Sequence, residues 1–301
     1  MASPVQRPVV VIIGDVMVDV VVVPLGPFNR GSDTPSRVVI SPGGSAANQA
    51  VALAAAGAEV HLVAAVGDDE FGRAAAGALA ATGAQVHLQV CRGQRTGVVV
   101  ALIDASGERS MLTDRGANLG LGTDALDPVL FVAGRHLHLS GYELLDEATR
   151  PVGLAALQLA AAAGMTRSVD PCSAGPLAAV GPAAFLSWTK GIEWCCANLD
   201  EGRALTGAIG PDDVLAALRP HYREVVVTLG AEGALLSGPG TDRLHCSADE
   251  VEVADTTGAG DAFTGTFLAR RLSGDRPEQA LRAGLAAAAR VVAEPGARSW
   301  R

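Results

Sequence analysis

Short apolar runs alternate with helical patterns along most of this chain. Residues 9–13 form a continuously apolar run that ends at Gly14-Asp15, which is typical of a buried strand. From residue 135 onward the alternation becomes regular, and strands are expected at residues 135–139, 166–170, 194–197 and 225–229. Helical patterns separate these strands, so the sequence predicts an α/β fold with a mainly parallel sheet and helices on both faces.

Two β-rich intervals interrupt this alternation in the first third of the chain. Their extended stretches are residues 19–23, 37–40, 85–90, 97–103 and 109–113. We expect them to form a small antiparallel sheet beside the core, with strands drawn from about residues 17–41 and 85–114. Residues 20–23 are apolar on both faces, so the second face of that sheet should meet substrate or a partner subunit. No linker or repeat divides the chain, and residues 1–301 are expected to form one domain.

The run DTTGAGD at residues 255–261 carries the clearest chemical signal. Gly258 and Gly260 allow backbone N–H groups to converge where a helical pattern begins, and such a helix N-terminus binds anions such as phosphate. Asp261 then falls in the first helical turn, where a general base would explain a carboxylate beside bound phosphate. An ordinary helix cap with a glycine turn is the alternative at this point.

Composition and net charge exclude several classes of binding partner and of phosphate-binding site. The formal net charge of −9 and the pI near 5.1 argue against nucleic-acid and anionic-membrane surfaces. Lys190 is the only lysine and no Walker phosphate loop is present, so phosphate must be held by backbone amides, arginine or metal. No run is long and apolar enough to span a bilayer, and a cytoplasmic protein with reduced cysteines is expected. His136 and His138 share one strand face and are expected to be packed core rather than a metal site.

Two long motifs resemble signatures of the PfkB/ribokinase family of sugar and nucleoside kinases. Residues 43–48 (GGSAAN) and 67–72 (GDDEFG) resemble the N-terminal signature, and residues 255–263 resemble the C-terminal one. The resemblance covers essentially the whole chain. It implies a ribokinase-like fold in which the small sheet is a lid over the substrate and also builds a homodimer. It further implies a kinase that uses ATP and Mg²⁺.

The resemblance also implies roles for single residues on the acceptor side. Asp261 would be the catalytic base, with Gly258, Ala259 and Gly260 donating backbone N–H groups to the transferring phosphoryl group. The residues that would bind the acceptor are Asp19, Gly43, Gly44 and Asn48, with Arg115, Asn118 and Tyr142 as further candidates. Arg115 could instead be a surface residue paired with Asp114, and Tyr142 could simply fill core.

A second set of implied roles concerns nucleotide and metal. The nucleotide site would comprise Asn198, Thr228, Gly230, Gly233 and again Gly260. Glu201 would hold Mg²⁺ through water. A monovalent-cation site for K⁺ would use Asp255, Thr257 and Gly296, although Trp300 departs from the family pattern there.

The acceptor is expected to be a small sugar or sugar-like molecule that is phosphorylated on a hydroxymethyl group. Met17 and Ser45 stand where ribokinases proper tend to carry asparagine and lysine, which speaks against a strict ribokinase. Two alternatives stay open at this point: an adenosine-like nucleoside kinase of the same family, and a non-catalytic sugar sensor on this fold.

Overall fold

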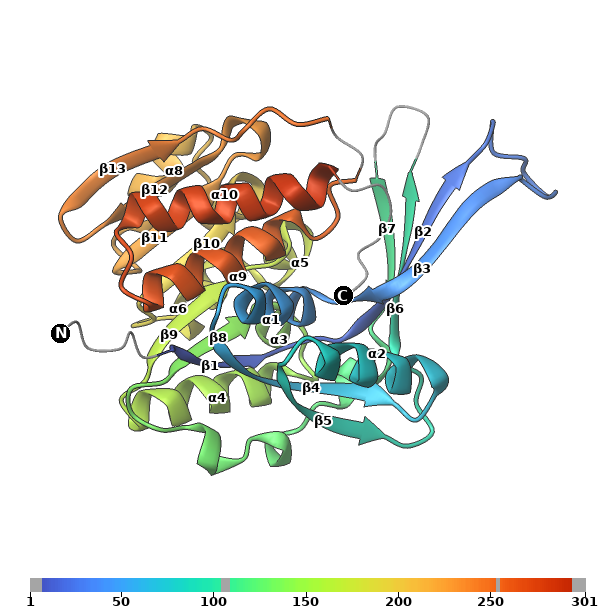
Figure 1. Cartoon of the computed structure of the whole chain (residues 1–301), viewed down its shortest axis with the longest axis horizontal. Coiled ribbons are helices and arrows are strands. Elements are labelled where there is room, and N and C mark those ends of the chain that lie inside the picture. The colour runs from blue at the N-terminus through green and yellow to red at the C-terminus, as the bar shows by residue number, and fades with distance from the viewer. Residues whose placement is uncertain (1–6, 104–108, 253–254, 294–301) are drawn as a thin grey trace.

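A large, mainly parallel sheet forms the body of the molecule. The computed structural model describes residues 7–103, 109–252 and 255–293. In this part of the chain the large sheet has nine strands in the order β13-β12-β11-β10-β9-β8-β1-β4-β5 (Figure 1). The strands are β1 (Val9–Ile13), β4 (Glu59–Gly67), β5 (Gln85–Cys91), β8 (His136–Ser140), β9 (Thr166–Asp170), β10 (Trp194–Asn198), β11 (Glu224–Thr228), β12 (Ala234–Gly238) and β13 (Thr241–Cys246). Among these described strands only the pairs β11–β12 and β12–β13 are antiparallel, so the predicted α/β architecture is confirmed.

Helices cover both faces of this sheet. They are α1 (Ser45–Ala55), α2 (Glu70–Ala81), α3 (Tyr142–Leu145), α4 (Arg150–Ala162), α5 (Ala174–Val180), α6 (Pro182–Trp188), α7 (Leu199–Thr206), α8 (Pro211–Leu218), α9 (Ala259–Leu272) and α10 (Pro277–Ala293). Successive residues of β1 point to opposite faces, as the strand period requires. Val10 and Ile12 pack with α1, α2, α9 and α10, whereas Val11 and Ile13 pack with α3 to α8.

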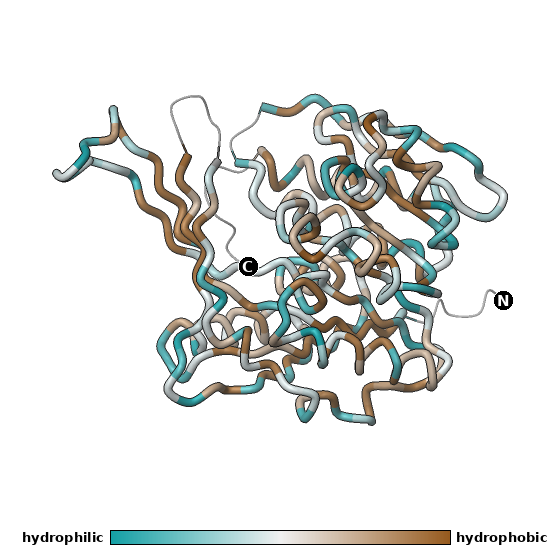
Figure 2. Tube along the Cα trace, turned by 180° about the vertical axis from the view of Figure 1, so that it is seen from behind, coloured by the Kyte–Doolittle hydropathy of each residue, from teal (hydrophilic) through white to brown (hydrophobic). Residues whose placement is uncertain are grey.

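The small sheet stands off one end of the body and is formed by β3 (Ser36–Gly43), β2 (Met17–Pro24), β6 (Gly97–Ile103) and β7 (Arg109–Asp114), in that order (Figure 2). It differs from the prediction in two ways. The central pair β2–β6 is parallel, so the sheet is mixed rather than antiparallel. β5 does not belong to it: residues 85–91 pair in parallel with β4, because α2 connects the two strands as the crossover of a β-α-β unit.

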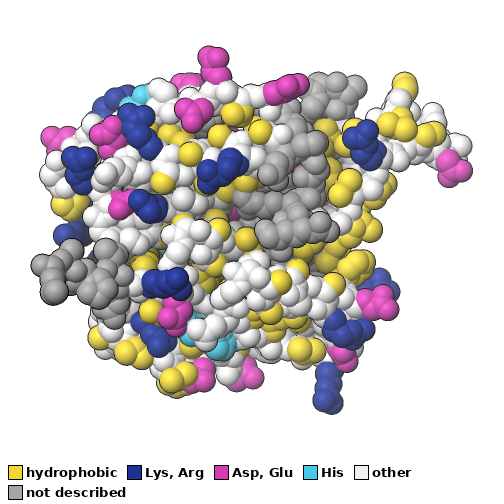
Figure 3. Space-filling view, in the orientation of Figure 1, with side chains coloured by type: hydrophobic (Ala, Val, Ile, Leu, Met, Phe, Trp, Pro, Cys, Tyr) yellow, Lys and Arg dark blue, Asp and Glu magenta, His cyan; other side chains and the backbone are white. Residues whose placement is uncertain are grey.

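One face of the small sheet exposes large apolar side chains. Val38 and Ile40 of β3 and Leu112 of β7 lie on this face, and each exposes more than half of its surface. Met111 points to the opposite face, toward the larger cavity described below. Figure 3 shows apolar side chains gathered on this side of the molecule. The small sheet therefore has an exposed apolar face, and the contact of its second face with substrate or a partner subunit stays a prediction.

Close contact between helices α1 and α9 brings the two sequence motifs together. A Cβ atom at Gly265 of α9 would lie 2.5 Å from the carbonyl oxygen of Gln49 on α1, so only glycine allows this approach. At the other end of α9, Arg271 makes two charge-assisted hydrogen bonds to Glu224 of β11, of 3.0 and 2.8 Å. The first turns of α1 and α9 are thus fixed side by side. Among the described helices, none is long and apolar enough to cross a membrane.

Candidate active site

Two adjoining cavities open at the carboxyl ends of the parallel strands, where α/β sheets usually bind ligands. The smaller cavity has a volume of about 140 Å³ and is lined by residues of β9, β10, α7 and α9. The larger has a volume of about 820 Å³ and lies between the body and the small sheet. Ser45, Cys172, Asn198, Gly258 and Asp261 line both cavities and mark where they meet.

The Asp261 carboxylate lies at this junction. It accepts hydrogen bonds from Ser45 Oγ (2.8 Å), Asn48 Nδ2 (3.0 Å) and Gln49 Nε2 (3.2 Å), all on α1. Three donors from one helix fix the orientation of the carboxylate. An oriented carboxylate that faces both cavities is placed to accept a proton from a ligand hydroxyl.

The N-terminus of α9 lies beside the same junction. Gly258 is the N-cap residue and adopts a left-handed conformation (φ 73°), which glycine accepts without strain. Gly258 and Gly260 both line the smaller cavity, at a helix end that favours anions. The amide of Ala259 donates to the carbonyl of Thr256 (3.3 Å), so the neighbouring amides of this turn are the candidates for contact with an anion.

Asp19 reaches the larger cavity from the small sheet. It lies in register with Val99 of β6, which in turn pairs with Thr113 of β7, and all three residues line the cavity. Burial, together with the neighbouring carboxylates led by Asp261, raises the pKa of Asp19 to about 7. Gly43 does not line the cavity but supports this residue, since a Cβ atom there would lie 2.3 Å from the Asp19 carboxylate.

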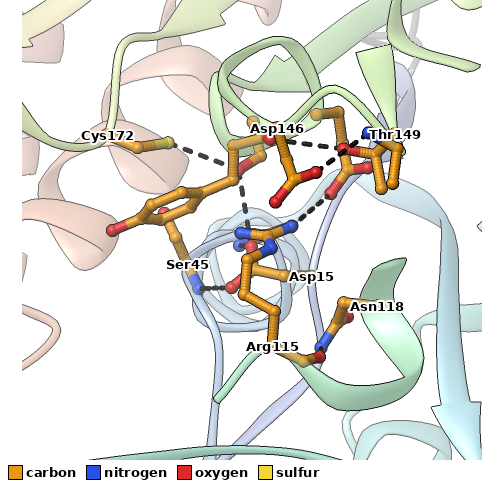
Figure 4. Close-up of polar contacts among 12 residues, drawn as sticks. Asp15, Ser45, Arg115, Asn118, Asp146, Thr149 and Cys172 are labelled. Carbon is orange, nitrogen blue, oxygen red and sulfur yellow. Dashed lines mark hydrogen bonds and ion pairs between the residues drawn. The ribbon is translucent and has the colours of Figure 1, made fainter. Parts of the chain in front are cut away.

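Gly44 and Asp15 shape the N-terminus of α1. Gly44 has a φ of +100°, and an added Cβ atom would lie 2.7 Å from the carbonyl oxygen of Asp15. The buried Asp15 carboxylate accepts from the amides of Ser45 (3.1 Å) and Ala46 (3.2 Å), as Figure 4 shows for Ser45. This contact caps the helix and leaves the Asn48 side chain directed toward the larger cavity.

Arg115 forms an ion pair that the sequence did not predict. Its guanidinium group, labelled in Figure 4, contacts the fully buried carboxylate of Glu143 (3.3 Å), not Asp114. It also lies over the ring of Tyr142, at 5.1 Å from the ring centroid. Arg115 and Tyr142 both line the larger cavity. Asn118, also expected to point into the site, is buried and bonds the backbone of Val16 in both directions, at 3.0 Å each.

Side chains with oxygen atoms line the smaller cavity. Asn198 caps α7 and exchanges hydrogen bonds with Glu201, including a 2.6 Å contact from Asn198 Nδ2 to the Glu201 carboxylate. Thr228 lines the same cavity. Burial and the charge of Asp170 raise the pKa of Glu201, and burial and the charge of Asp261 raise the pKa of Asp170 to about 7.

This set of donors fits Mg²⁺. The ion prefers oxygen ligands and keeps several waters. In the described part of the chain, no group of three acidic, histidine or cysteine side chains is arranged to bind a metal directly. A divalent cation would also offset the charge of Asp170, which together with burial raises the pKa of Glu201.

Other predicted ligands lie at less direct positions. Gly230 and Gly233 occupy the turn after β11 and line neither cavity, and both have positive φ angles, of 60° and 99°. Thr257 lines the larger cavity, and its amide donates to Asp255 Oδ1 (2.8 Å). Gly296 lies outside the described residues.

Sequence reasoning missed four residues of the site: Asp15, Gln49, Asp170 and Cys172. Asp15 and Asp170 each stand at or just after the end of a buried strand, which is the position where a polar residue often serves a ligand. Cys172 has a φ of 70° and its thiol contacts Ser140 Oγ (3.3 Å). Gln49 gave no signal, because its role depends on contacts between separate elements.

Comparisons with known proteins agree with this geometry. The family model described as "pfkB family carbohydrate kinase" matches residues 8–300. A fructokinase of Solanum tuberosum is 31% identical over 237 residues, which are 76% of this chain and 71% of that protein. A 2-dehydro-3-deoxygluconokinase of Thermoproteus tenax is 32% identical over 84% of this chain and 80% of its own length. The solved structure of a fructokinase from Vibrio cholerae O395, with fructose, ADP and calcium bound, is similar with a TM-score of 0.82 and 26% identity, covering 98% of this chain and 96% of that one.

The fold and these relatives define a carbohydrate kinase, an ATP-dependent phosphotransferase with an alcohol group as acceptor. The small separate sheet beside a large parallel sheet is the ribokinase-like architecture that the resemblance implied. The chain belongs to the PfkB family of carbohydrate kinases.

Proposed function

We propose that this protein transfers the γ-phosphoryl group of ATP to a hydroxymethyl group of a small neutral sugar. The observation that carries this proposal is the position of Asp261, whose carboxylate lies in the first turn of α9 and lines both cavities. From there it can take a proton from an acceptor hydroxyl while amides of the same turn face the transferring phosphoryl group.

The reaction would then follow from the placement of a few groups. Asp19 and Asn48 hold the sugar hydroxyls in the larger cavity, beside the backbone of Gly44. Asp261 accepts the proton as the hydroxyl oxygen attacks the γ-phosphorus, and the bond from that phosphorus to the oxygen of the β-phosphate breaks to release ADP. The N-terminus of α9, with Gly258 and Gly260, stabilises the developing negative charge.

The charge of the larger cavity favours a neutral acceptor. Its described lining contains four carboxyl groups, from Asp15, Asp19, Asp146 and Asp261, and a single cationic side chain, Arg115. The Arg115 guanidinium is already engaged by the buried Glu143. An acceptor that carries a carboxylate or phosphate would therefore face net negative surroundings, which disfavours binding. By this argument the acceptor resembles the one named for the fructokinases more than the acid named for the gluconokinase relative.

A nucleoside is the second candidate acceptor. The observation in its favour is an apolar wall of the larger cavity, formed by Met17, Val99, Met111, Leu145 and Pro176. Tyr142 lies near this wall, but Arg115 covers its ring. We place the neutral sugar first, because hydroxyl groups suit the carboxyl and amide side chains that lie beside Asp261.

A panel of acceptors tests the proposal. ADP production is measured with ATP and Mg²⁺ for neutral pentoses and hexoses, for the corresponding sugar acids and sugar phosphates, and for nucleosides. We expect at least one neutral sugar to exceed its acid by about a hundredfold in kcat/KM, as like charges in the cavity would require. Preference for an acid or a nucleoside would contradict the neutral-sugar assignment. Absence of turnover with a sugar that raises the Tm would favour a sensor.

The raised pKa of Asp19 leads to a pH prediction. With a pKa of about 7, the carboxyl group is mainly protonated at lower pH and becomes a full hydrogen-bond acceptor as pH rises through that value. If the charged form binds sugar hydroxyls, KM for the sugar should fall by up to about tenfold between about pH 6 and pH 8. Asp19→Asn should raise KM and abolish this pH dependence, while a pH-dependent KM that survives in the variant would exclude Asp19 as its source.

Metal, oligomer and location complete the proposal. Glu201 would hold Mg²⁺ through water in the smaller cavity, where the ion would neutralise charge on the β- and γ-phosphates. Asp255 and Thr257 would contribute to a K⁺ site, and Thr228 with the turn at Gly230 and Gly233 would border the nucleotide. The exposed apolar face of the small sheet would build a homodimer. The need for ATP fits a cytoplasmic enzyme.

A further inference from the structure

A row of buried polar side chains crosses the large sheet beneath the candidate base. Thr166, Ser168 and Asp170 lie on one face of β9, and His136 and His138 lie beside them on β8, in register with Thr166 and Ser168. Both histidines and Ser168 are almost fully buried, whereas Thr166 is exposed. Buried polar groups are costly unless they are bonded, so a row of this kind needs an explanation beyond packing.

Every described neighbour in this row is joined by a hydrogen bond. Thr166 Oγ1 lies 2.8 Å from His136 Nδ1, and His136 Nε2 lies 2.7 Å from Ser168 Oγ. Ser168 Oγ lies 2.6 Å from His138 Nδ1, and His138 Nε2 lies 2.8 Å from Gln49 Oε1. The chain of bonds therefore runs from the solvent-exposed start of β9 to Gln49 on helix α1.

Gln49 links this chain to the carboxylates of the site. Its fully buried amide nitrogen lies 2.8 Å from Asp170 Oδ2, 3.2 Å from Asp261 Oδ1 and 3.2 Å from Ser45 Oγ. Two carboxylates on one side of an amide require its NH₂ group to face them, so the amide oxygen must face His138.

This orientation fixes the direction of every bond in the row. Because Gln49 Oε1 can only accept, His138 must carry its proton on Nε2, and its Nδ1 then accepts from Ser168. Ser168 in turn accepts from His136 Nε2, and His136 Nδ1 accepts from Thr166. All the donors point toward Asp170 and Asp261. Both histidines are neutral in this arrangement, in agreement with burial, which lowers the pKa of His138 to about 3 and that of His136 well below its usual range.

We infer that Gln49 and His138 are positioning residues for the catalytic base. His138 holds the Gln49 carboxamide in the one orientation that donates to both Asp170 and Asp261, and Gln49 thereby keeps Asp261 charged and aimed at the junction of the cavities. The row does not carry protons to the site, because the amide of Gln49 interrupts any path of exchangeable protons. This inference rests on the proposed role of Asp261.

Three other acidic groups influence the charge of Asp261. Asp170 of β9, Glu201 of α7 and Asp19 of β2 are all electrostatically coupled to its carboxylate. Each of these acids disfavours the charged form of Asp261, whereas the Gln49 amide favours it. Loss of the amide donor should therefore move the acid limb of the kcat profile to higher pH.

Gln49→Met is the direct test, because methionine keeps the length of the side chain and removes its polar atoms. We expect kcat to fall about tenfold or more, as for the loss of a hydrogen bond to a charged group, while KM for the sugar changes less than about threefold. The acid limb of the kcat profile should shift to higher pH. Thr166→Val is the matched control at the far end of the row, and it should change kcat by less than about twofold.

A pair of variants at His138 tests the proposed orientation. Glutamine can present an N–H group near the position of Nε2, so His138→Gln should keep most of the wild-type kcat, whereas His138→Leu should reproduce the effects of Gln49→Met. If His138→Leu fails to fold, as judged by its melting curve, Gln49→Met is compared with His138→Gln instead. A reduced kcat in Gln49→Met together with a retained kcat in His138→Gln would support the proposed orientation, and the reverse would contradict it.

Failure of the positioning role and failure of the proposed function would give different results. Wild-type kcat and an unshifted acid limb in Gln49→Met, with Asp261→Asn inactive, would overturn the positioning role and leave the proposed function intact. Normal turnover in Asp261→Asn would overturn the proposed function itself.

Discussion

Asp261→Asn should lower kcat by about a thousandfold or more while leaving the protein folded and able to bind sugar. Asparagine keeps the shape of the side chain but cannot accept the proton of the attacking hydroxyl. The amide oxygen of asparagine can still accept from Ser45, and a flip of the Asn48 amide would let its oxygen accept from the new NH₂ group, so KM for the sugar should change little. Steady-state ADP release and sugar binding by calorimetry measure the two quantities separately.

A second acidic residue provides the control for this variant. Asp212 is exposed and pairs with Arg243, and neither residue lines either cavity. Asp212→Asn removes the same charge from the molecule and should retain wild-type kcat. A rate near wild type in Asp261→Asn, with normal folding, would contradict the assignment of the base.

Arg271→Met should strongly destabilise the fold without changing the chemistry. The variant leaves the Glu224 carboxylate, only 3% exposed, without the bidentate partner that it has at the C-terminal end of α9. An uncompensated buried charge of this kind lowers the free energy of unfolding by about 3–5 kcal/mol. The expected result is a clear drop in the midpoint of urea unfolding, with kcat unchanged well below the transition.

The double variant Glu224→Gln with Arg271→Met tests whether the unpaired charge of Glu224 causes the loss of stability. Removing the second charge should recover a large part of the lost stability, because glutamine no longer places an unpaired charge in the interior. A double variant no more stable than Arg271→Met would show that lost packing of the arginine stem, rather than the stranded charge, causes the effect.

The fold was largely predictable from the period of apolar residues, and its main error has a physical explanation. Residues 85–90 alternate polar and apolar positions, as an edge strand of either sheet would. Pairing partners are set by the crossover through α2, which packs β5 beside β4, and this long-range choice leaves no local pattern. The parallel direction of β2 relative to β6 was not predicted for the same reason, since local sequence does not specify which strands pair.

The candidate site was predictable where its residues lie in contiguous motifs. The runs around Gly44 and Gly258 place Asn48 and Asp261 at the starts of two helices, and the structure brings these side chains within 3.0 Å. Isolated residues could not be assigned in this way. The partner of Arg115 proved to be Glu143, which is 28 positions away, and local sequence offers only the adjacent Asp114.

The proposed acceptor site draws on two separate sheets. Asp19 belongs to the small sheet and Asp261 to a helix packed on the large one, so no single rigid element sets the distance between these two carboxyl groups. A sugar that bonded to both residues would connect the two sheets and fix the angle between them. Water is too small to make both contacts, and for this reason the enzyme is expected to hydrolyse ATP only slowly when no acceptor is bound.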